Sequence, residues 1–261
     1  MVSEDAAKLN ARVLCPPRIA RQHRRWENPS NMIVSHKHKF VFIKTNKTAG
    51  TSTEIALSKF CGPQDIIAPI SAQDEATRHS LGYPGAQNYL APSTDYGIAD
   101  HLRRWISGKQ KRRYYNHMSA REVKGFLGEK TWNEYYKFCF ERHPYDRVIS
   151  LYYWRHKKEP RPSISQFLDS GVPNLLRKRG YDLYTIDGTM AVDRVCLYEN
   201  MSDELRRLEQ QFGFASPLDL PRAKGSHRTD RRNPRDILDE VDKQRIRQLF
   251  RIEFELFGYD A

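Results

Sequence analysis

Residues 40–60 read FVFIKTNKTAGTSTEIALSKF, and this stretch decides the fold. Its first four residues are aromatic and β-branched, which is typical of a short buried strand at the centre of a parallel sheet. Thr51, with Glu54 three residues later, matches a capping box, and helical spacing continues to a stop at Gly62. The stretch therefore predicts a strand, a polar loop and a helix in succession.

The order of strand and then helix recurs twice along the chain. Residues 135–140 predict a strand before a helix at 145–154, and residues 194–198 predict a strand before a helix that is capped by Ser202 and ends at Gly213. Strands that alternate with helices favour the α/β class. We therefore predict a single domain with a mainly parallel central sheet flanked by helices.

The other segments are less regular. Ser119 and Glu122 form a second capping box before a short helix, and apolar residues at helical spacing predict a C-terminal helix that ends at Gly258. Residues 62–116 predict helices and long loops without assigned boundaries. Residues 1–38 show no sustained period, so we expect an N-terminal extension (1–38) and one domain (39–261).

The composition limits the classes of function. The 261 residues include 44 Lys and Arg against 32 Asp and Glu, a formal net charge of +12 at pH 7. Nucleic acid, anionic lipid, a charged glycan and a polyphosphorylated ligand all fit this charge. The four cysteines have no paired spacing, so neither a disulfide framework nor a zinc site is indicated. Apolar runs are strand-sized and no secretory signal is evident, so we expect a cytoplasmic protein without a transmembrane segment.

The loop at residues 44–52 lies where a helix begins after a strand. Such a position offers backbone N–H groups and the positive end of the helix dipole to an anion. The loop is not a Walker A motif, because Gly50 is followed by Thr51 and Ser52 while Lys47 lies upstream. Taken alone, the loop fits an ordinary capped helix equally well.

A second candidate for anion binding follows the strand at residues 135–140. Arg142 ends that strand and offers a planar guanidinium to phosphate. Ser150 lies about two turns into the next helix, from where its hydroxyl can face back toward the arginine.

Together the two motifs resemble the carbohydrate sulfotransferases that use 3′-phosphoadenosine 5′-phosphosulfate (PAPS), including heparan sulfate 2-O-sulfotransferase and its soluble bacterial relatives. The resemblance covers roughly residues 39–261 and includes Tyr198-Glu199-Asn200 and Phe257-Gly258-Tyr259. It implies a P-loop-like sulfotransferase fold and an enzyme that transfers a sulfuryl group from PAPS to a hydroxyl of a glycan or glycoside. No metal is expected.

The resemblance also implies roles for individual residues. It assigns the 3′-phosphate to Arg142 and Ser150, and the leaving phosphate oxygen to Lys47. The residues expected around the 5′-phosphosulfate are Lys47, Thr48, Gly50, Thr51 and Ser52. The residues expected in a late loop that closes over the nucleotide are Lys224, Ser226 and Arg228.

Transfer to a hydroxyl needs a base that takes the proton. Histidine suits this role, because with an ordinary pKa of about 6.5 it is largely neutral at physiological pH. Among nine histidines, His117 lies just before the second capping box, and its segment resembles the one that holds the catalytic histidine of the family. His101 and His79 are the alternatives, and a helix-capping or surface histidine is the other interpretation of His117.

Two other functions remain open from the sequence. A kinase that uses ATP and Mg²⁺ is disfavoured by the missing Gly-Lys-Ser/Thr and by the lack of an apolar strand ending in aspartate. A basic protein that binds nucleic acid or another polyanion is supported by the charge but by no motif. We expect no nucleic acid as partner. The sequence leaves open which hydroxyl accepts the sulfuryl group and the oligomeric state.

Overall fold

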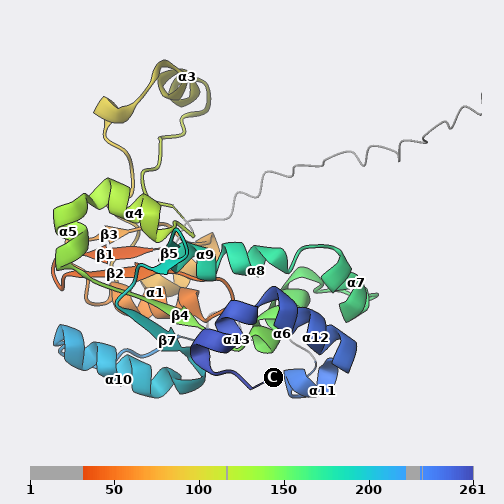
Figure 1. Ribbon diagram of the computed structural model, residues 1–261. Coiled ribbons are helices and arrows are strands. Elements are labelled where there is room, and N and C mark those ends of the chain that lie inside the picture. The colour runs from red at the N-terminus through yellow and green to blue at the C-terminus, as the bar shows by residue number, and fades with distance from the viewer. Residues whose placement is uncertain (1–31, 116, 222–229, 231, 261) are drawn as a thin grey trace, which may run out of the picture.

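The computed structural model describes residues 32–115, 117–221, 230 and 232–260. Five strands form a central sheet in the order β3-β1-β2-β4-β7 (Figure 1). These strands are β1 (Ile33–Ser35), β2 (Phe40–Ile43), β3 (Ile66–Ile67), β4 (Tyr136–Glu141) and β7 (Arg194–Leu197). A separate two-stranded ribbon contains β5 (Thr185–Ile186) and β6 (Thr189–Met190).

The predicted central sheet flanked by helices is confirmed, but the sheet is mixed, with two parallel and two antiparallel pairings. β4 runs parallel to both of its neighbours, with Ile43 of β2 opposite Cys139 and Phe140 opposite Cys196 of β7. β1 is antiparallel to β2 and to β3. The carboxyl ends of β2, β4 and β7 therefore meet at one edge of the sheet, where ligands of open α/β sheets bind.

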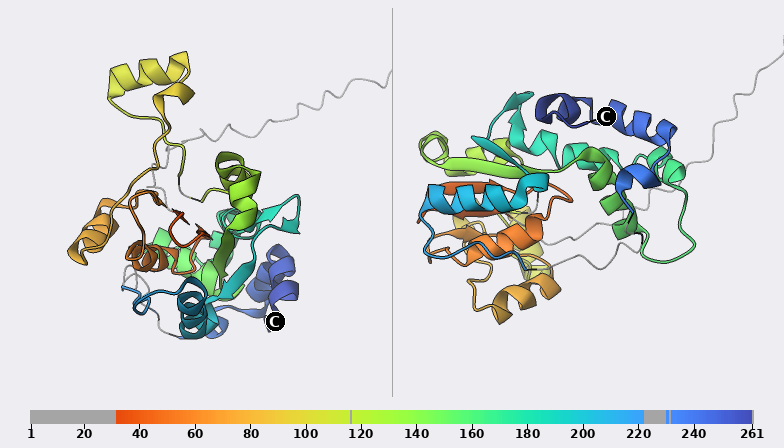
Figure 2. Two further views of the ribbon diagram at one scale, coloured as in Figure 1. Left: turned by 90° about the vertical axis from the view of Figure 1, so that its left-hand side faces the viewer. Right: turned by 90° about the horizontal axis from the view of Figure 1, so that it is seen from below.

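Helices cover both faces of the sheet, as the α/β class requires (Figures 1 and 2). The α-helices are α1 (Gly50–Ser58), α2 (Ala72–Ser80), α3 (Ile98–Ser107), α4 (Ala120–Leu127), α5 (Glu129–Glu134), α6 (Pro144–Arg155), α7 (Ile164–Asp169), α8 (Asn174–Lys178), α9 (Tyr181–Tyr184), α10 (Met201–Phe212), α11 (Pro234–Ile237), α12 (Glu240–Leu249) and α13 (Arg251–Phe257). Two 3₁₀-helices are η1 (Ser93–Asp95) and η2 (Tyr198–Asn200). No described helix is long and apolar enough to cross a membrane.

Successive side chains of β2 point to opposite faces and so join different apolar clusters. Phe40 and Phe42 pack in a cluster with residues of α1 and α10. Val41 and Ile43 pack in a cluster with residues of α4, α5 and α9. A third cluster joins α6 to α7, α8, α12 and α13 beyond the sheet. This arrangement holds α1 and α6 firmly, and these are the helices that follow the two motifs predicted to bind anions.

Four features predicted for the helices differ from the structure. α1 ends at Ser58, before the stop predicted at Gly62. Ala49 is the N-cap of α1, and Glu54 pairs with buried cations, so the capping box predicted there is wrong. Ser202 lies inside α10, whose N-cap is Asn200. The C-terminal helix is divided into α12 and α13, because Phe250 leaves the helical conformation. The box formed by Ser119 and Glu122 is confirmed.

β1 is a strand that the sequence analysis did not predict. It lies within residues 1–38, which we assign to an extension, and it forms a hairpin with β2. Only three residues pair, and that is too short for an alternating pattern to show in the sequence. The boundary at residue 39 stays a prediction, although described residues before it contribute to the sheet.

Candidate functional site

The first part of the site is the loop between β2 and α1. Lys44 follows β2 directly, is buried, and donates from Nζ to Oγ1 of Thr51 at 2.8 Å. The same Nζ lies 3.4 Å from Oε2 of Glu54, whose other oxygen pairs with the buried Arg78. Burial raises the pKa of Glu54 to about 7, against the opposing effects of Lys44 and Arg78. Lys44 therefore connects the end of the strand to the first turn of the helix.

The loop backbone takes an unusual path. Lys47 and Ala49 have φ values of 67° and 60°, in the left-handed region that residues other than glycine seldom adopt. The hydroxyls of Thr45 and Thr48 hydrogen-bond at 2.8 Å, and Asn46 N–H donates to the carbonyl of Arg179 at 2.7 Å. Left-handed residues at such a turn are typical of loops whose N–H groups form a concavity for an anion.

The start of α1 adds donors to this concavity. Its first intrahelical bond runs from Thr53 N–H to the carbonyl of Ala49 at 3.1 Å. The N–H groups of Gly50 and its two successors therefore precede that bond, at the positive end of the helix dipole.

Cationic side chains gather beside the loop. Nζ of Lys47 lies 5.4 Å from the ring centre of Trp154, near the end of α6, and the Arg155 guanidinium lies 5.7 Å from that centre. Burial and the neighbouring charge of Arg155 lower the pKa of Arg179. These positive charges from three segments favour a ligand with more than one negative charge.

His117 lies at the same loop. Its Nδ1 is 3.0 Å from the carbonyl oxygen of Lys44, although the two residues are far apart in the sequence. A carbonyl only accepts, so Nδ1 donates, and in the neutral ring Nε2 carries the lone pair. The backbone of His117 is also left-handed, with φ of 52°. The alternatives are exposed: His79 lies near the end of α2 and His101 on α3.

Arg142 lies after β4, at the same edge of the sheet. Its guanidinium stacks over the ring of Tyr198, 4.2 Å from the ring centre, and Nη2 donates to Oδ1 of Asp146 at 2.7 Å. Its Nε is buried and has no hydrogen-bond partner among the described residues. Ser150 is half-buried two turns along α6. A planar guanidinium at this end of the sheet suits an anionic ligand.

Arg147 lies between Arg142 and Ser150 in the sequence, but its contacts stabilise the fold. It is fully buried, forms an ion pair with Glu141 and donates to the carbonyl of Leu176 at 2.8 Å. The hydroxyl of Tyr184 donates to the other Glu141 oxygen at 3.0 Å. A Cβ on Gly180 would lie 2.3 Å from Nη2 of Arg147. These contacts fix the end of β4 and so the position of the arginine that follows it.

Other segments of the predicted motifs meet near the start of α6. Glu199 Oε1 accepts the N–H of His143 at 2.8 Å, and the ring of Tyr259 lies 4.9 Å from that imidazole. His143 also caps α6 by accepting the N–H of Tyr145 at 3.3 Å. The Tyr198-Glu199-Asn200 and C-terminal motifs thus support the helix that follows Arg142.

Some predicted residues are not placed, and some site residues were not predicted. Lys224, Ser226 and Arg228 lie outside the described residues. Lys44 was not predicted as a site residue, although a charged residue directly after a buried strand could have indicated it. Nothing in the sequence indicates that Arg179 belongs to the site, because only the fold brings it to the loop.

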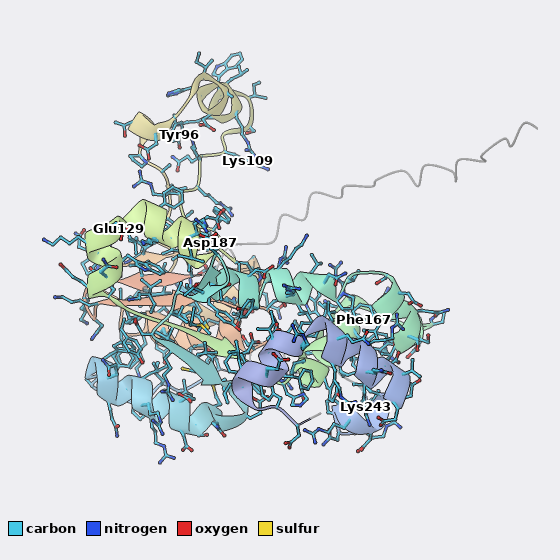
Figure 3. All side chains as sticks on the ribbon, viewed as in Figure 1. Tyr96, Lys109, Glu129, Phe167, Asp187 and Lys243 are labelled. Carbon is cyan, nitrogen blue, oxygen red and sulfur yellow. The ribbon has the colours of Figure 1, made fainter. Side chains whose placement is uncertain are left out.

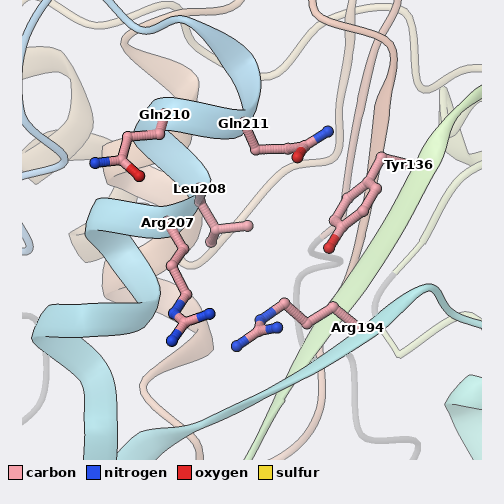
Figure 4. A pocket seen from close by; sticks show the side chains of 6 residues that line it. All are labelled: Tyr136, Arg194, Arg207, Leu208, Gln210 and Gln211. Atoms are coloured by element: carbon pink, nitrogen blue, oxygen red, sulfur yellow. The ribbon is translucent and has the colours of Figure 1, made fainter.

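A separate pocket of about 370 Å³ lies at the opposite edge of the sheet (Figure 4). Tyr136 and Arg194 line it, and they are the first residues of β4 and β7. Arg207 turns its guanidinium toward Arg194, which already forms two hydrogen bonds with Glu204, at 2.7 and 2.8 Å. This pocket is therefore not part of the site at the carboxyl ends.

We predict that Gly50→Ala lowers the free energy of unfolding by about 1–3 kcal/mol, because the added methyl overpacks the loop. A Cβ at this position would lie 2.6 Å from Cγ of Lys44, whose side chain is held at its far end. Urea unfolding measures the effect. Gly125→Ala is the control: it meets nothing within 4 Å in α4 and is expected to stabilise by up to about 1 kcal/mol. Equal stability of the two variants would contradict the packing described for Lys44.

The fold and site define an α/β protein with a loop between a strand and a helix that is suited to an anion. The sequence profile of the sulfotransferase family matches residues 30–177, more than half of the chain. The chain therefore belongs to the sulfotransferase family, whose activity is the transfer of a sulfuryl group. It is also similar to an uncharacterized protein of Archaeoglobus fulgidus, with 29% identity over 106 residues, which cover 40% of this chain and 88% of that protein. No solved structure matches the chain.

Proposed function

We propose that this sulfotransferase transfers the sulfuryl group of PAPS to a hydroxyl of a carbohydrate. The observation that carries the proposal is the contact of His117 with the carbonyl of Lys44, at 3.0 Å. It joins a candidate base to a loop suited to an anion, which are the two parts that sulfuryl transfer needs. The carbohydrate acceptor rests on the resemblance of the motifs.

In the proposed reaction, Nε2 of His117 takes the proton of the acceptor hydroxyl. The hydroxyl oxygen forms a bond to sulfur while the bond from sulfur to the phosphate oxygen breaks. The ammonium of Lys47 stabilises the negative charge that develops on that oxygen, in the way that cations stabilise a leaving group in phosphoryl transfer.

The donor is proposed to bind through both anion-binding motifs. The backbone N–H groups of the loop, with Thr48, Thr51 and Ser52, would hold the 5′-phosphosulfate. Arg142, through its guanidinium, and Ser150 would hold the 3′-phosphate. The two motifs follow neighbouring parallel strands, so their ligand has anionic groups at two places along one sheet edge.

The kinase alternative has less support. β2, β4 and β7 are followed by Lys44, Arg142 and Tyr198, none of which offers a carboxylate to Mg²⁺. The last residue of β4 is Glu141, but its carboxylate is buried against Arg147.

Binding of 3′-phosphoadenosine 5′-phosphate, the desulfated donor, tests the proposal. We expect thermal-shift measurements to show stabilisation by this nucleotide, and little by ATP or a short DNA. Arg142→Ala should bind it about 10–100-fold more weakly, since hydrogen bonds to charged groups contribute roughly 1.5–3 kcal/mol. Arg251→Ala, an exposed arginine paired with Glu255, is the matched control and should bind like wild type.

Two outcomes would contradict the proposal. Stabilisation by ATP with Mg²⁺ alone would favour the kinase. Unchanged affinity of Arg142→Ala for the nucleotide would remove the 3′-phosphate role from this arginine.

A further inference from the structure

The segment at residues 93–113, here called the α3 arm, projects from the rest of the structure (Figures 1 and 2). It contains η1 and α3, and the segment that returns from α3 is held by ion pairs. Lys111 Nζ lies 2.7 Å from Oδ2 of Asp100, and Arg113 pairs with Asp95. These ion pairs connect the two sides of the arm, and α3 lies at its tip.

α3 buries none of its residues. Ile98 is 91% exposed, Leu102 53%, Trp105 84% and Ile106 69%. Their spacing places all four side chains on one side of the helix, and the polar residues, Arg103 and Arg104 among them, on the other sides. The side chains around α3, between the labelled Tyr96 and Lys109, extend into open space (Figure 3). A contiguous exposed patch of this kind marks a binding surface.

The charge of the arm indicates which surface it fits. Six Lys and Arg stand against two Asp in residues 93–113, and both aspartates are paired within the arm. An apolar stripe with tryptophan, flanked by arginines, complements the boundary between anionic headgroups and acyl chains. A second copy of the chain fits less well, because a symmetric contact would bring two cationic arms together.

We propose that the α3 arm docks the protein on an anionic lipid surface. Ile98, Leu102, Trp105 and Ile106 would enter the interface, with Arg103 and Arg104 at the lipid phosphates. This inference does not depend on the donor or on the acceptor.

Flotation with lipid vesicles tests the proposal. The full chain should float with vesicles of phosphatidylcholine and phosphatidylserine, but not with phosphatidylcholine alone, and high salt should weaken binding. Trp105→Ser with Ile106→Ser, and separately Arg103→Gln with Arg104→Gln, should each reduce binding to the mixed vesicles roughly tenfold or more. All four residues are exposed, so the variants should unfold at the wild-type temperature.

The control is Val241→Ser, which removes an exposed apolar side chain from α12 and should leave flotation unchanged. Wild-type protein that fails to float with the mixed vesicles would overturn the proposal, as would equal flotation of the Trp105 variant. If sedimentation shows a wild-type dimer that this variant abolishes, while no flotation occurs, the arm contacts a second copy instead.

Discussion

His117→Ala is expected to slow sulfuryl transfer by about 10²–10⁴, the contribution of a positioned general base. The hydrogen bond of Nδ1 to the Lys44 carbonyl would then be lost together with the proton acceptor at Nε2. Binding of 3′-phosphoadenosine 5′-phosphate should change little, because the imidazole is not assigned to the donor. Turnover with a labelled donor, and calorimetry with the desulfated nucleotide, measure the two effects separately.

The pH dependence of turnover gives a second measurement of the same role. A base acts in its neutral form, so wild-type turnover should rise with pH as the imidazole loses its proton, and this rise should be absent from the variant. His79→Ala is the matched control, an exposed histidine on α2. If the His79 variant loses turnover while the His117 variant keeps it, the assignment is wrong.

Lys47→Ala is expected to lower the rate of the chemical step by about 10²–10³, as the loss of one group that stabilises developing charge does in other enzymes. The affinity for the desulfated nucleotide should fall much less than the rate. Arg142→Ala is expected to lower the affinity more than the rate, because we propose that this arginine contacts a part of the donor that does not react. Single-turnover kinetics at saturating donor separate the two variants.

Lys59→Ala serves as the control for this experiment. Its Nζ lies 5.4 Å from the ring centre of Phe60, the same distance as that from Lys47 to Trp154, but on the opposite end of α1. If Lys59→Ala turns over like wild type while Lys47→Ala is slow, the loss comes from the missing charge at the leaving group. It does not come from the removal of a cation beside an aromatic ring. A large loss of nucleotide affinity in Lys47→Ala with a normal chemical rate would contradict the assigned role.

The sequence predicts the centre of the fold well, because its signals there are local. β2 is an apolar run, β4 is rich in aromatic residues, and α6 begins with a proline, so each element can be recognised from its own residues. β1 has too few residues to show a pattern. Thr51 and Glu54 match a capping box in spacing, but a buried lysine and arginine, distant in sequence, take the carboxylate instead. Local patterns fail where tertiary contacts compete for the same side chain.

The residues of the candidate site could likewise be predicted where the sequence pattern is local, and not where tertiary contacts decide. The loop around Lys47 and the arginine at residue 142 stand directly after predicted strands, so parallel pairing brings them to one edge. The contact between His117 and Lys44 joins residues from distant segments, and no spacing could reveal it. Arg147 shows the reverse, because its place between Arg142 and Ser150 in the sequence gave no sign that it is buried against Glu141.

The left-handed backbone of Lys47, Ala49 and His117 affects the rate of ligand binding and its cost in conformational entropy. These conformations are unfavourable in the unfolded chain, so the packing of the fold maintains them before any donor arrives. A loop that is already shaped loses little conformational entropy on binding, and more of the interaction energy then appears as affinity. Donor binding by such a loop should proceed as a single fast step, without a slow rearrangement of the backbone.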